Sequence, residues 1–432
     1  MDSQEGNGHI QMSSPKKDKW VVPISVSAEH TMNPIRRIVD QMKIEPNPEY
    51  EFISVSIGDP TVFGNLNPPQ EAVDAIVEAT ISGKYNGYLP AVGLSAAREA
   101  VARFESTPEA PLTEKDVIIV SGCSAAIEMA MRVLADPGDN ILIPNPGFSL
   151  YRTIAGAEGF ETRFYRLLPD RGWEADLEHL ESQIDKRTRF ILVNNPSNPC
   201  GSVYSKEHLL QLIGIAERHR LPIISDEIYA YSVFKNETFY PIASLTTTVP
   251  VLALGAISKR FLVPGWRVGW ILVHDRNDAF KDVRSGLADS ATKILGPCAI
   301  IQGALPSILA NTPKSFFDET MRYIEKNAEI CYLNLSMVPG LKPVKPRGAM
   351  YMMVGIDESL MKHVKDELDF TQRLVSAKSV FCLPGSCFGY ANFFRIVLTP
   401  PEEMLRKACE RIGQFCREIL GPDAQNGTEN SH

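Results

Sequence analysis

From about Pro68 onward, the chain alternates amphipathic helical stretches with short runs of β-branched and other apolar residues that are bounded by turn residues. Each short run is typical of a buried strand followed by a turn. The alternation of such strands with helices predicts an α/β fold with a mostly parallel central sheet. The expected strands are VIIV (117–120), ILIPNP (141–146), RFILVNNP (189–196), LPIISDEI (221–228), VLALGAIS (251–258) and GWILVHD (269–275).

The pattern changes near Phe316, where a long helical stretch begins that continues to Tyr332. A mixed α+β segment follows from about Leu341 to Leu420 and contains the apolar runs GAMYMMVGI and FFRIVLT. Residues 33–67, which precede the sheet, are expected to pack with this segment. We therefore predict a flexible N-terminal segment (1–32), a small domain from both ends of the chain (33–67 and 331–420), a large ligand-binding domain (68–330) and a flexible tail (421–432).

Composition and charge narrow the kind of partner. The chain has 432 residues, of which 44% are hydrophobic and 22% are charged, as in an ordinary soluble globular protein. Its formal net charge of −8 is spread along the chain, so neither nucleic acid nor an anionic membrane surface is an expected partner. We therefore expect the protein to act on a small molecule.

Targeting and metal-binding patterns are missing from the sequence. No apolar run approaches the roughly 18–20 residues of a membrane span, and the N-terminal residues contain neither an apolar signal segment nor the arginines of a mitochondrial presequence. The eight cysteines have no paired CxxC spacing, which favours reduced thiols and gives no reason to expect a metal. These features predict a cytoplasmic protein.

Polar residues gather where the predicted strands end. Ligands of open α/β sheets bind in the crevice beyond the carboxyl ends of the strands, so these residues are candidates for a site. They are Gly122, Cys123 and Ser124 after the first strand, Asn194, Asn195 and Asn198 after the third, Asp226 and Tyr229 after the fourth, and Lys259 after the fifth.

The stretch SGCSAAIEM, between a strand and a helix, is suited to bind an anion. Its glycine and small polar residues allow backbone N–H groups and the helix N-terminus to point at a phosphate. An ordinary turn in which Ser124 caps the helix explains the same residues equally well. The chain has neither the GxGxxG fingerprint nor a P-loop lysine, which argues against the two most common other phosphate sites.

Lys259 and Arg267 lie on either side of a Pro-Gly turn in SKRFLVPGWRVGW. A deprotonated lysine amine forms a Schiff base with a carbonyl cofactor, and a partly desolvated, cationic pocket promotes deprotonation. Arg267 would bind a phosphate through two parallel hydrogen bonds. The motif SKR taken alone fits a surface lysine better, so the functional prediction depends on the apolar context and on the glycines of the turn.

Three further polar residues have both a functional and a structural explanation. Asp226 would pair with a protonated ring nitrogen, or it is a solvated carboxylate that caps the next helix. Asn198 can donate to a phenolic oxygen, although a turn such as NNPSNPCG needs no ligand to explain it. Arg395 lies in the apolar run FFRIVLT, where an unpaired guanidinium is costly; we expect a carboxylate partner from a substrate, or alternatively from the protein.

In their order along the chain, these segments resemble the fold-type I pyridoxal 5′-phosphate (PLP) aminotransferase family, and most of all its members that act on tyrosine. The likeness extends from about Asn33 to about Cys416 and rests on SIGDPTVFGNL, GKYNGY, SGCSAAI, NPGFSLY, NNPSNPCGSV, DEIY, SKRFLVPGWRVGWIL, ILGPC, RGAMYMMVGI and CLPGSCF. It implies PLP in the large domain, a homodimer with shared active sites, and transfer of the amino group from L-tyrosine and other aromatic amino acids to 2-oxoglutarate.

The resemblance also implies roles for individual residues. These are Lys259 as the PLP-bearing general acid and base, Asp226 at the pyridine nitrogen, Tyr229 and Asn198 at the phenolic oxygen, Phe148 on the ring, Gly122, Cys123, Ser124, Ser258, Arg267 and the neighbouring subunit's Tyr88 at the phosphate, and Gly58, Asn198 and Arg395 around the substrate. The chain departs from many relatives at Ala256, where they have a phosphate-binding serine. It also lacks, near Lys293, a counterpart of the arginine that dicarboxylate-specific relatives use, which fits an aromatic or broad substrate.

Two alternatives stay open. Carbon–sulfur lyases, 1-aminocyclopropane-1-carboxylate synthases and alanine or broad-specificity aminotransferases share the same lysine, aspartate and arginine, so these residues do not separate them. The second alternative is a non-catalytic binding module with the same fold, and the filled catalytic positions argue against it.

Overall fold

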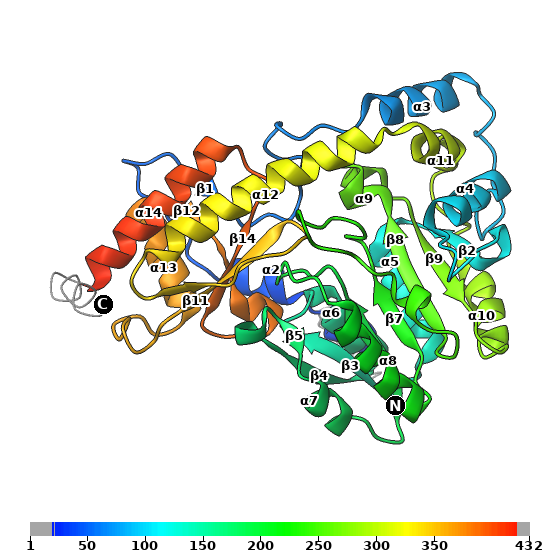
Figure 1. The fold of residues 1–432 in the computed structure, drawn as a ribbon, viewed down its shortest axis with the longest axis horizontal. Coiled ribbons are helices and arrows are strands. Elements are labelled where there is room, and N and C mark those ends of the chain that lie inside the picture. The colour runs from blue at the N-terminus through cyan, green and yellow to red at the C-terminus, as the bar shows by residue number, and fades with distance from the viewer. Residues whose placement is uncertain (1–19, 21, 421–432) are drawn as a thin grey trace, which may run out of the picture.

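The computed structural model describes residue 20 and residues 22–420, which form three β-sheets surrounded by helices (Figure 1). The largest sheet has eight strands in the order β2-β9-β8-β7-β6-β3-β4-β5. Their bounds are β2 (Val117–Val120), β3 (Asn140–Asn145), β4 (Glu161–Leu168), β5 (Glu174–Ala175), β6 (Thr188–Asn194), β7 (Ile223–Asp226), β8 (Val251–Ala256) and β9 (Gly269–His274). All the strands predicted from the sequence are present, whereas β4 and β5 were not predicted.

The centre of the large sheet is parallel, as predicted. Strands β4, β3, β6, β7 and β8 run parallel to one another, β9 is antiparallel to β8 and β2, and the short β5 is antiparallel to β4. The register pairs Asn194 at the end of β6 with Asp226 at the end of β7. The carboxyl ends of the parallel strands therefore bring two of the predicted polar residues side by side.

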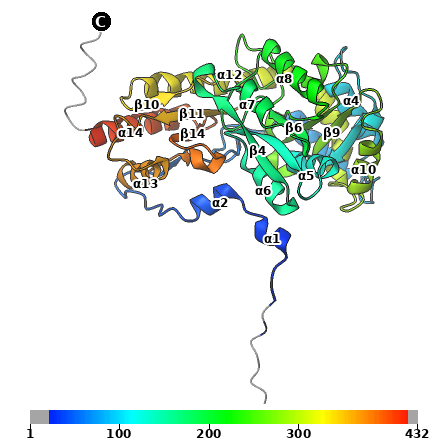
Figure 2. The ribbon, with the colours of Figure 1, turned by 90° about the horizontal axis from the view of Figure 1, so that it is seen from below.

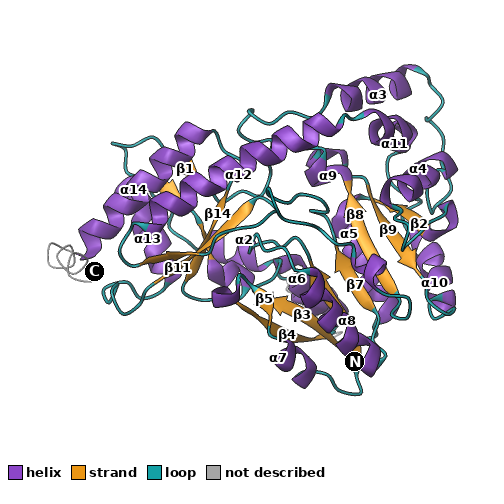
Figure 3. Ribbon diagram, viewed as in Figure 1, coloured by secondary structure: helices purple, strands orange, loops and turns teal. Residues whose placement is uncertain are grey.

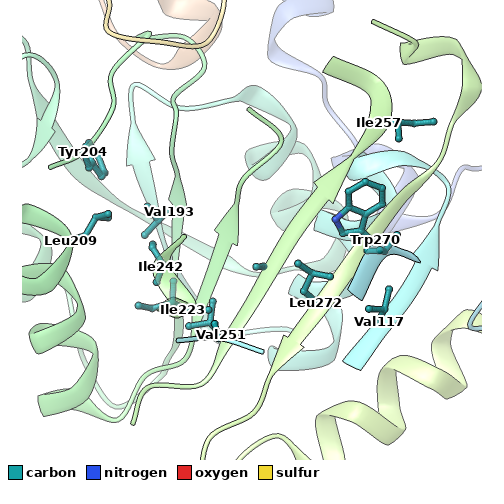
Figure 4. Packing of buried hydrophobic residues seen from close by; sticks show 14 of the residues in the cluster. Val117, Val193, Tyr204, Leu209, Ile223, Ile242, Val251, Ile257, Trp270 and Leu272 are labelled. Carbon is teal, nitrogen blue, oxygen red and sulfur yellow. The ribbon is translucent and has the colours of Figure 1, made fainter. Parts of the chain in front are cut away.

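Helices cover both faces of the large sheet (Figure 3), and the side chains of a strand alternate between two apolar cores. In β2, Val117 and Ile119 belong to one core, and Ile118 and Val120 belong to the other. Figure 4 shows part of the first core, where Trp270 packs among aliphatic side chains. The first core includes residues of α4 (Ser95–Glu105), α7 (Leu177–Ser182), α8 (Lys206–His219) and α11 (Ala299–Asn311). Helix α3 (Gln70–Ile81) packs against α11. The second core includes residues of α5 (Gly122–Leu134), α6 (Ser149–Glu158) and α10 (Lys281–Ala291).

A smaller antiparallel sheet, with the order β10-β11-β14-β13, forms the other end of the molecule (Figure 1, left). Its strands are β10 (Leu341–Pro343), β11 (Tyr351–Ile356), β13 (Leu383–Pro384) and β14 (Phe393–Val397), and it packs with α12 (Lys314–Ser336), α13 (Glu367–Lys378) and α14 (Glu402–Leu420). β1 (Ile53–Ser54) pairs in parallel with β12 (Val380–Phe381), so a segment that precedes the large sheet lies beside the C-terminal part of the chain. The domain boundaries stay a prediction, and α12 crosses the one placed between residues 330 and 331.

Part of the N-terminal segment packs on α6, within the stretch 1–32 that was predicted to be flexible; that prediction stays untested. This part contains α1 (Val26–His30), and α2 (Pro34–Val39) follows it (Figure 2). The Thr153 hydroxyl of α6 donates to the Met32 carbonyl (2.9 Å). A β-carbon at Gly156 would lie 2.8 Å from the His30 carbonyl oxygen, so a glycine lets α1 approach α6 closely. Residues 1–19 and 21, and the predicted tail 421–432, lie outside the described residues.

Three general properties of the described residues bear on function. No helix within residues 22–420 is long and apolar enough to cross a membrane. The same part of the chain contains no group of three or more His, Cys, Asp or Glu side chains that could hold a metal ion. All eight cysteines are free thiols, and all but Cys298 are buried.

A buried asparagine fastens α12 to the chain that follows β14. The Asn327 side chain is fully buried, and its Nδ2 atom donates to the carbonyls of Leu398 (2.8 Å) and Pro400 (2.9 Å). The Pro400 carbonyl also accepts from the Tyr323 hydroxyl (2.9 Å). Loss of the asparagine therefore leaves the Leu398 carbonyl without this donor in the protein interior, which is costly.

We expect Asn327→Ala to lower the free energy of unfolding by about 1–3 kcal/mol, because a buried carbonyl loses its donor. The control is Asn334→Ala on the same helix, since this exposed side chain bonds within the helix to the Ile330 carbonyl (2.7 Å). It should change the free energy of unfolding by less than about 0.5 kcal/mol. Urea unfolding of both variants measures the difference, and equal losses would contradict the role given to Asn327.

Candidate active site

A cavity of about 390 Å³ lies at the carboxyl ends of the parallel strands, with residues of β11 and β14 on its other side. Its volume is in the range of sites that bind a small cofactor and substrate. Most of the residues predicted from the sequence line it: Gly58, Cys123, Ser124, Phe148, Asn198, Asp226, Tyr229, Ser258, Lys259, Arg267 and Arg395. A second hollow beside Lys259, of about 30 Å³, has room for little more than one or two water molecules.

Lys259 faces the cavity because the chain turns where β8 ends. The strand stops at Ala256, and the short helix α9 (Ile257–Arg260) follows. The half-buried Lys259 amine donates to the Gly58 carbonyl (2.5 Å). On the next residue, the Arg260 guanidinium packs against three aromatic rings, which anchors α9. The alternative of a surface lysine is therefore wrong.

Asp226 is buried at the end of β7, with 2% of its surface exposed. Its Oδ2 atom accepts from the Tyr151 hydroxyl (2.6 Å), and its Oδ1 atom accepts from the Ile228 N–H (3.2 Å) and from the Cys123 thiol (3.6 Å). Burial raises the pKa of Asp226, and these donors lower it. The alternative of a solvated helix cap is therefore wrong, and a cation in the cavity would stabilise the ionised form.

Arg395 is 3% exposed on β14. Its Nη1 atom donates to Asn198 Oδ1 (2.8 Å), and its Nη2 atom donates to the Ser56 carbonyl (2.6 Å). Its Nε atom is buried without a partner among the described residues. Desolvation lowers the pKa of Arg395, and no Asp or Glu of residues 22–420 pairs with it. The sequence left open whether a substrate or the protein supplies the carboxylate partner of Arg395. No carboxylate of the described residues does so.

Tyr229 lines the same cavity as these two charged residues and is 3% exposed. Its hydroxyl is 2.7 Å from the Tyr351 hydroxyl, and the two rings meet edge to face with centroids 5.8 Å apart. Burial and the neighbouring Tyr351 hydroxyl raise the pKa of Tyr229 well above its usual value, so the phenol stays protonated. It can therefore serve as a hydrogen-bond donor.

The N-terminus of α5 meets Arg267, which also lines the cavity. Arg267 has a positive φ of 52°, and its guanidinium donates to the carbonyls of Pro264 (2.9 Å) and Ser121 (3.2 Å). Gly122 also has a positive φ of 76°, and a β-carbon there would lie 2.5 Å from Arg267 Nη2. Gly122 therefore makes room for the arginine instead of lining the cavity itself.

Two serines, Ser124 and Ser258, also line this cavity. Ser258 Oγ is buried and unpaired among the described residues. Ser124 is exposed and is the third residue of α5, whose N-cap residue is Ser121. The alternative that Ser124 caps the helix is therefore wrong. A guanidinium, the N–H groups of a helix N-terminus and free hydroxyls together suit a phosphate.

The structure does not bring every predicted residue into the cavity, and it shows two tyrosines, missed in the prediction, that bond residues of the cavity. Tyr88 is 91% exposed and lies outside the cavity lining. Tyr151, which bonds Asp226, and Tyr351, which bonds Tyr229, were not predicted. Both belong to segments that carried the family resemblance, NPGFSLY and RGAMYMMVGI. Their sequence positions do not reveal which partner each hydroxyl finds.

The chain resembles known aminotransferases over most of its length. The family described as aminotransferase class I and II matches residues 50–412. Tyrosine aminotransferase of Mus musculus is 53% identical over 404 residues, which cover 93% of this chain and 89% of that protein. Two similar solved structures are tyrosine aminotransferase from Leishmania infantum (TM-score 0.89, 34% identity, 92% of this chain and 99% of that chain) and alanine aminotransferase from Pyrococcus furiosus (TM-score 0.85, 29% identity, 92% and 100%). The chain therefore has the fold-type I architecture and belongs to the aminotransferase class I and II family.

Proposed function

We propose that this chain is a PLP-dependent tyrosine aminotransferase. It converts L-tyrosine to 4-hydroxyphenylpyruvate and passes the amino group to 2-oxoglutarate, which gives L-glutamate, as the first step of tyrosine catabolism. One observation carries the proposal: Lys259, the buried Asp226 carboxylate and the buried Arg395 guanidinium face the same cavity. The high identity to the Mus musculus enzyme supports tyrosine over the substrates of the alternative fold-type I enzymes.

The residues of the cavity fit PLP. The unpaired Ser258 hydroxyl and the Arg267 guanidinium line this cavity and would bind the phosphate. The buried Asp226 carboxylate offers a partner for a protonated ring nitrogen, and Phe148 lines the same cavity. When bound, PLP supplies a ring that withdraws electrons and stabilises negative charge on the substrate α-carbon.

Each end of the cofactor would have its own set of holding residues. Asp226 would hold the ring nitrogen, and the hydrogen bond from the Tyr151 hydroxyl favours the ionised carboxylate. Tyr229 and Asn198 would donate to the ring oxygen, and Phe148 would stack on the ring. The phosphate would be bound by Cys123, Ser124, Ser258 and Arg267, with Gly122 giving the arginine its place.

Lys259 would carry out the proton transfer on the substrate, and Arg395 would bind its carboxylate. Lys259 would attach the cofactor and then, once its amine is free, move the proton to and from the α-carbon as general acid and base. The Arg395 guanidinium would grip the α-carboxylate, since it is buried and pairs with no protein carboxylate among the described residues. The Gly58 carbonyl would accept a hydrogen bond from the Lys259 amine and hold it near the substrate carboxylate.

We also propose a cytoplasmic homodimer in which Tyr88 completes the phosphate site of the partner. The Tyr88 side chain is 91% exposed in the single chain, so it is free to reach a second copy. Such an arrangement would leave each active site incomplete in a monomer.

Replacement of Lys259 by alanine should lower kcat at least about 10⁴-fold, because cofactor attachment and proton transfer both need the amine. The melting temperature should stay close to that of the wild type. Lys407→Ala, on an exposed position of α14, is the control and should keep full activity. Near-normal turnover of the Lys259 variant would refute the mechanism.

Arg395→Lys should lower kcat/KM for L-tyrosine by about 100-fold or more, because a buried point charge does not replace the two parallel hydrogen bonds of a guanidinium. The absorbance spectrum of the bound cofactor should not change. Arg373→Lys, on the exposed side of α13, serves as the control. Steady-state kinetics with both variants measure the effect, and an unchanged kcat/KM in Arg395→Lys would exclude Arg395 as the carboxylate ligand.

Tyr88→Phe should weaken PLP binding by about tenfold, because the phosphate loses a hydrogen bond to a charged oxygen. Equilibrium dialysis measures the dissociation constant, and sedimentation shows whether the variant is still a dimer. Unchanged PLP affinity in a dimeric variant would argue against a site shared between subunits.

A further inference from the structure

Tyr351 lines the cavity but has no role in the proposed mechanism. It is the first residue of β11 and is 1% exposed, yet it lines the cavity. Its partner strand β14 carries Arg395: the register pairs Tyr351 with Val397 and Met353 with Arg395. Tyr351 and Arg395 are therefore diagonal neighbours across two strands, within reach of one another's side chains.

The hydroxyl of Tyr351 is enclosed by Gly58 and Tyr229. A β-carbon at Gly58 would lie 2.7 Å from this oxygen, so the glycine leaves just enough room for it. The hydroxyl forms a hydrogen bond of 2.7 Å with the Tyr229 hydroxyl. Two phenols that share one hydrogen bond use one proton for it, and the proton of the accepting phenol stays available for another partner.

The ring of Tyr351 forms one wall of the Arg395 site. The Arg395 guanidinium carbon lies 4.3 Å from the centroid of the Tyr351 ring and 4.7 Å from that of Phe388. A guanidinium held against two aromatic rings is restricted in orientation, and the cation–π attraction is stronger where water is excluded. The ring and the hydroxyl of Tyr351 thus contact two different functional residues.

We propose that Tyr351 is a positioning residue: its hydroxyl donates to Tyr229, which leaves the Tyr229 proton free for the cofactor oxygen, and its ring holds the Arg395 guanidinium in place for the substrate carboxylate. This inference rests on the proposed function, since it assigns a ligand to each of the two residues. It links cofactor binding and substrate binding through one side chain of the small sheet.

The direction of the hydrogen bond between the two phenols follows from the role proposed for Tyr229. The charged and titratable groups that face it are Tyr351 on β11, Arg395 on β14 and Asp226 on β7, with Lys259 of α9 lining the same cavity. A Tyr229 phenol that donates to the cofactor oxygen has no second proton for Tyr351, so Tyr351 must be the donor. Donors in series polarise one another, which makes Tyr229 a stronger donor.

The experiment is a pH titration of the visible absorbance of the holoenzyme. In Tyr351→Phe, Tyr229 becomes a weaker donor, and the negative charge on the cofactor oxygen is less stabilised. The pH at the midpoint of the absorbance change should therefore rise by roughly 0.2–0.6 pH unit. In a Tyr229→Phe background, the same change should give no further shift. Tyr165→Phe is the control, because that hydroxyl is buried outside the cavity and donates to the Leu192 carbonyl (2.9 Å).

The role of the ring is tested with 3-(4-hydroxyphenyl)propionate, a carboxylate that has no amino group to react. Tyr351→Phe keeps the ring and should bind it within about twofold of the wild type, whereas Tyr351→Leu should bind it about fivefold more weakly. An unmoved midpoint in a folded, PLP-loaded Tyr351→Phe enzyme would overturn the hydroxyl role alone, and equal binding by the phenylalanine and leucine variants would overturn the ring role. A wild-type protein with no visible band in the presence of PLP would overturn the proposed function itself.

Discussion

Two opposite charges are buried at the same cavity, and neither forms an ion pair within the part of the chain that the structure describes. Asp226 is 2% exposed and Arg395 is 3% exposed. Burial raises the pKa of the carboxyl and lowers that of the guanidinium, so the fold works against both charged forms. Neutral partners offset part of this cost: the Tyr151 hydroxyl bonds Asp226, and the Asn198 amide oxygen accepts from Arg395. A cationic ring nitrogen and a substrate carboxylate would supply the missing opposite charges.

The site depends on how two sheets are placed against each other. Asp226 ends a parallel strand of the large sheet, whereas Arg395 lies in the middle of an antiparallel strand of the small sheet. The long helix α12 runs between these two parts (Figure 1), and its Asn327 side chain holds the chain that leaves β14. The Lys259 amine adds a further link through the Gly58 carbonyl. The residues proposed for binding and catalysis therefore also form contacts between these two parts of the molecule.

The sequence was sufficient to predict the features that rest on local pattern. A strand that is buried on both faces has a continuous apolar sequence. Such runs, each followed by polar residues, therefore predicted the central strands and the lysine at the end of β8. β4 escaped prediction because it mixes Glu161 and Arg166 with apolar residues, and its pairing with β3 comes from the tertiary structure. The tyrosines that bond Asp226 and Tyr229 were missed for a related reason: a hydroxyl's partner 75 or 122 residues away leaves no local trace.

We propose that Lys259 holds PLP and that L-tyrosine gives up its amino group at this site. The most direct measurement is an absorbance spectrum of the purified, PLP-loaded protein before and after addition of L-tyrosine without any oxo acid. We expect a visible band that falls on addition of tyrosine while a near-ultraviolet band of the pyridoxamine form rises. A visible band that tyrosine leaves unchanged would contradict the substrate, and no visible band at all would contradict the role of Lys259.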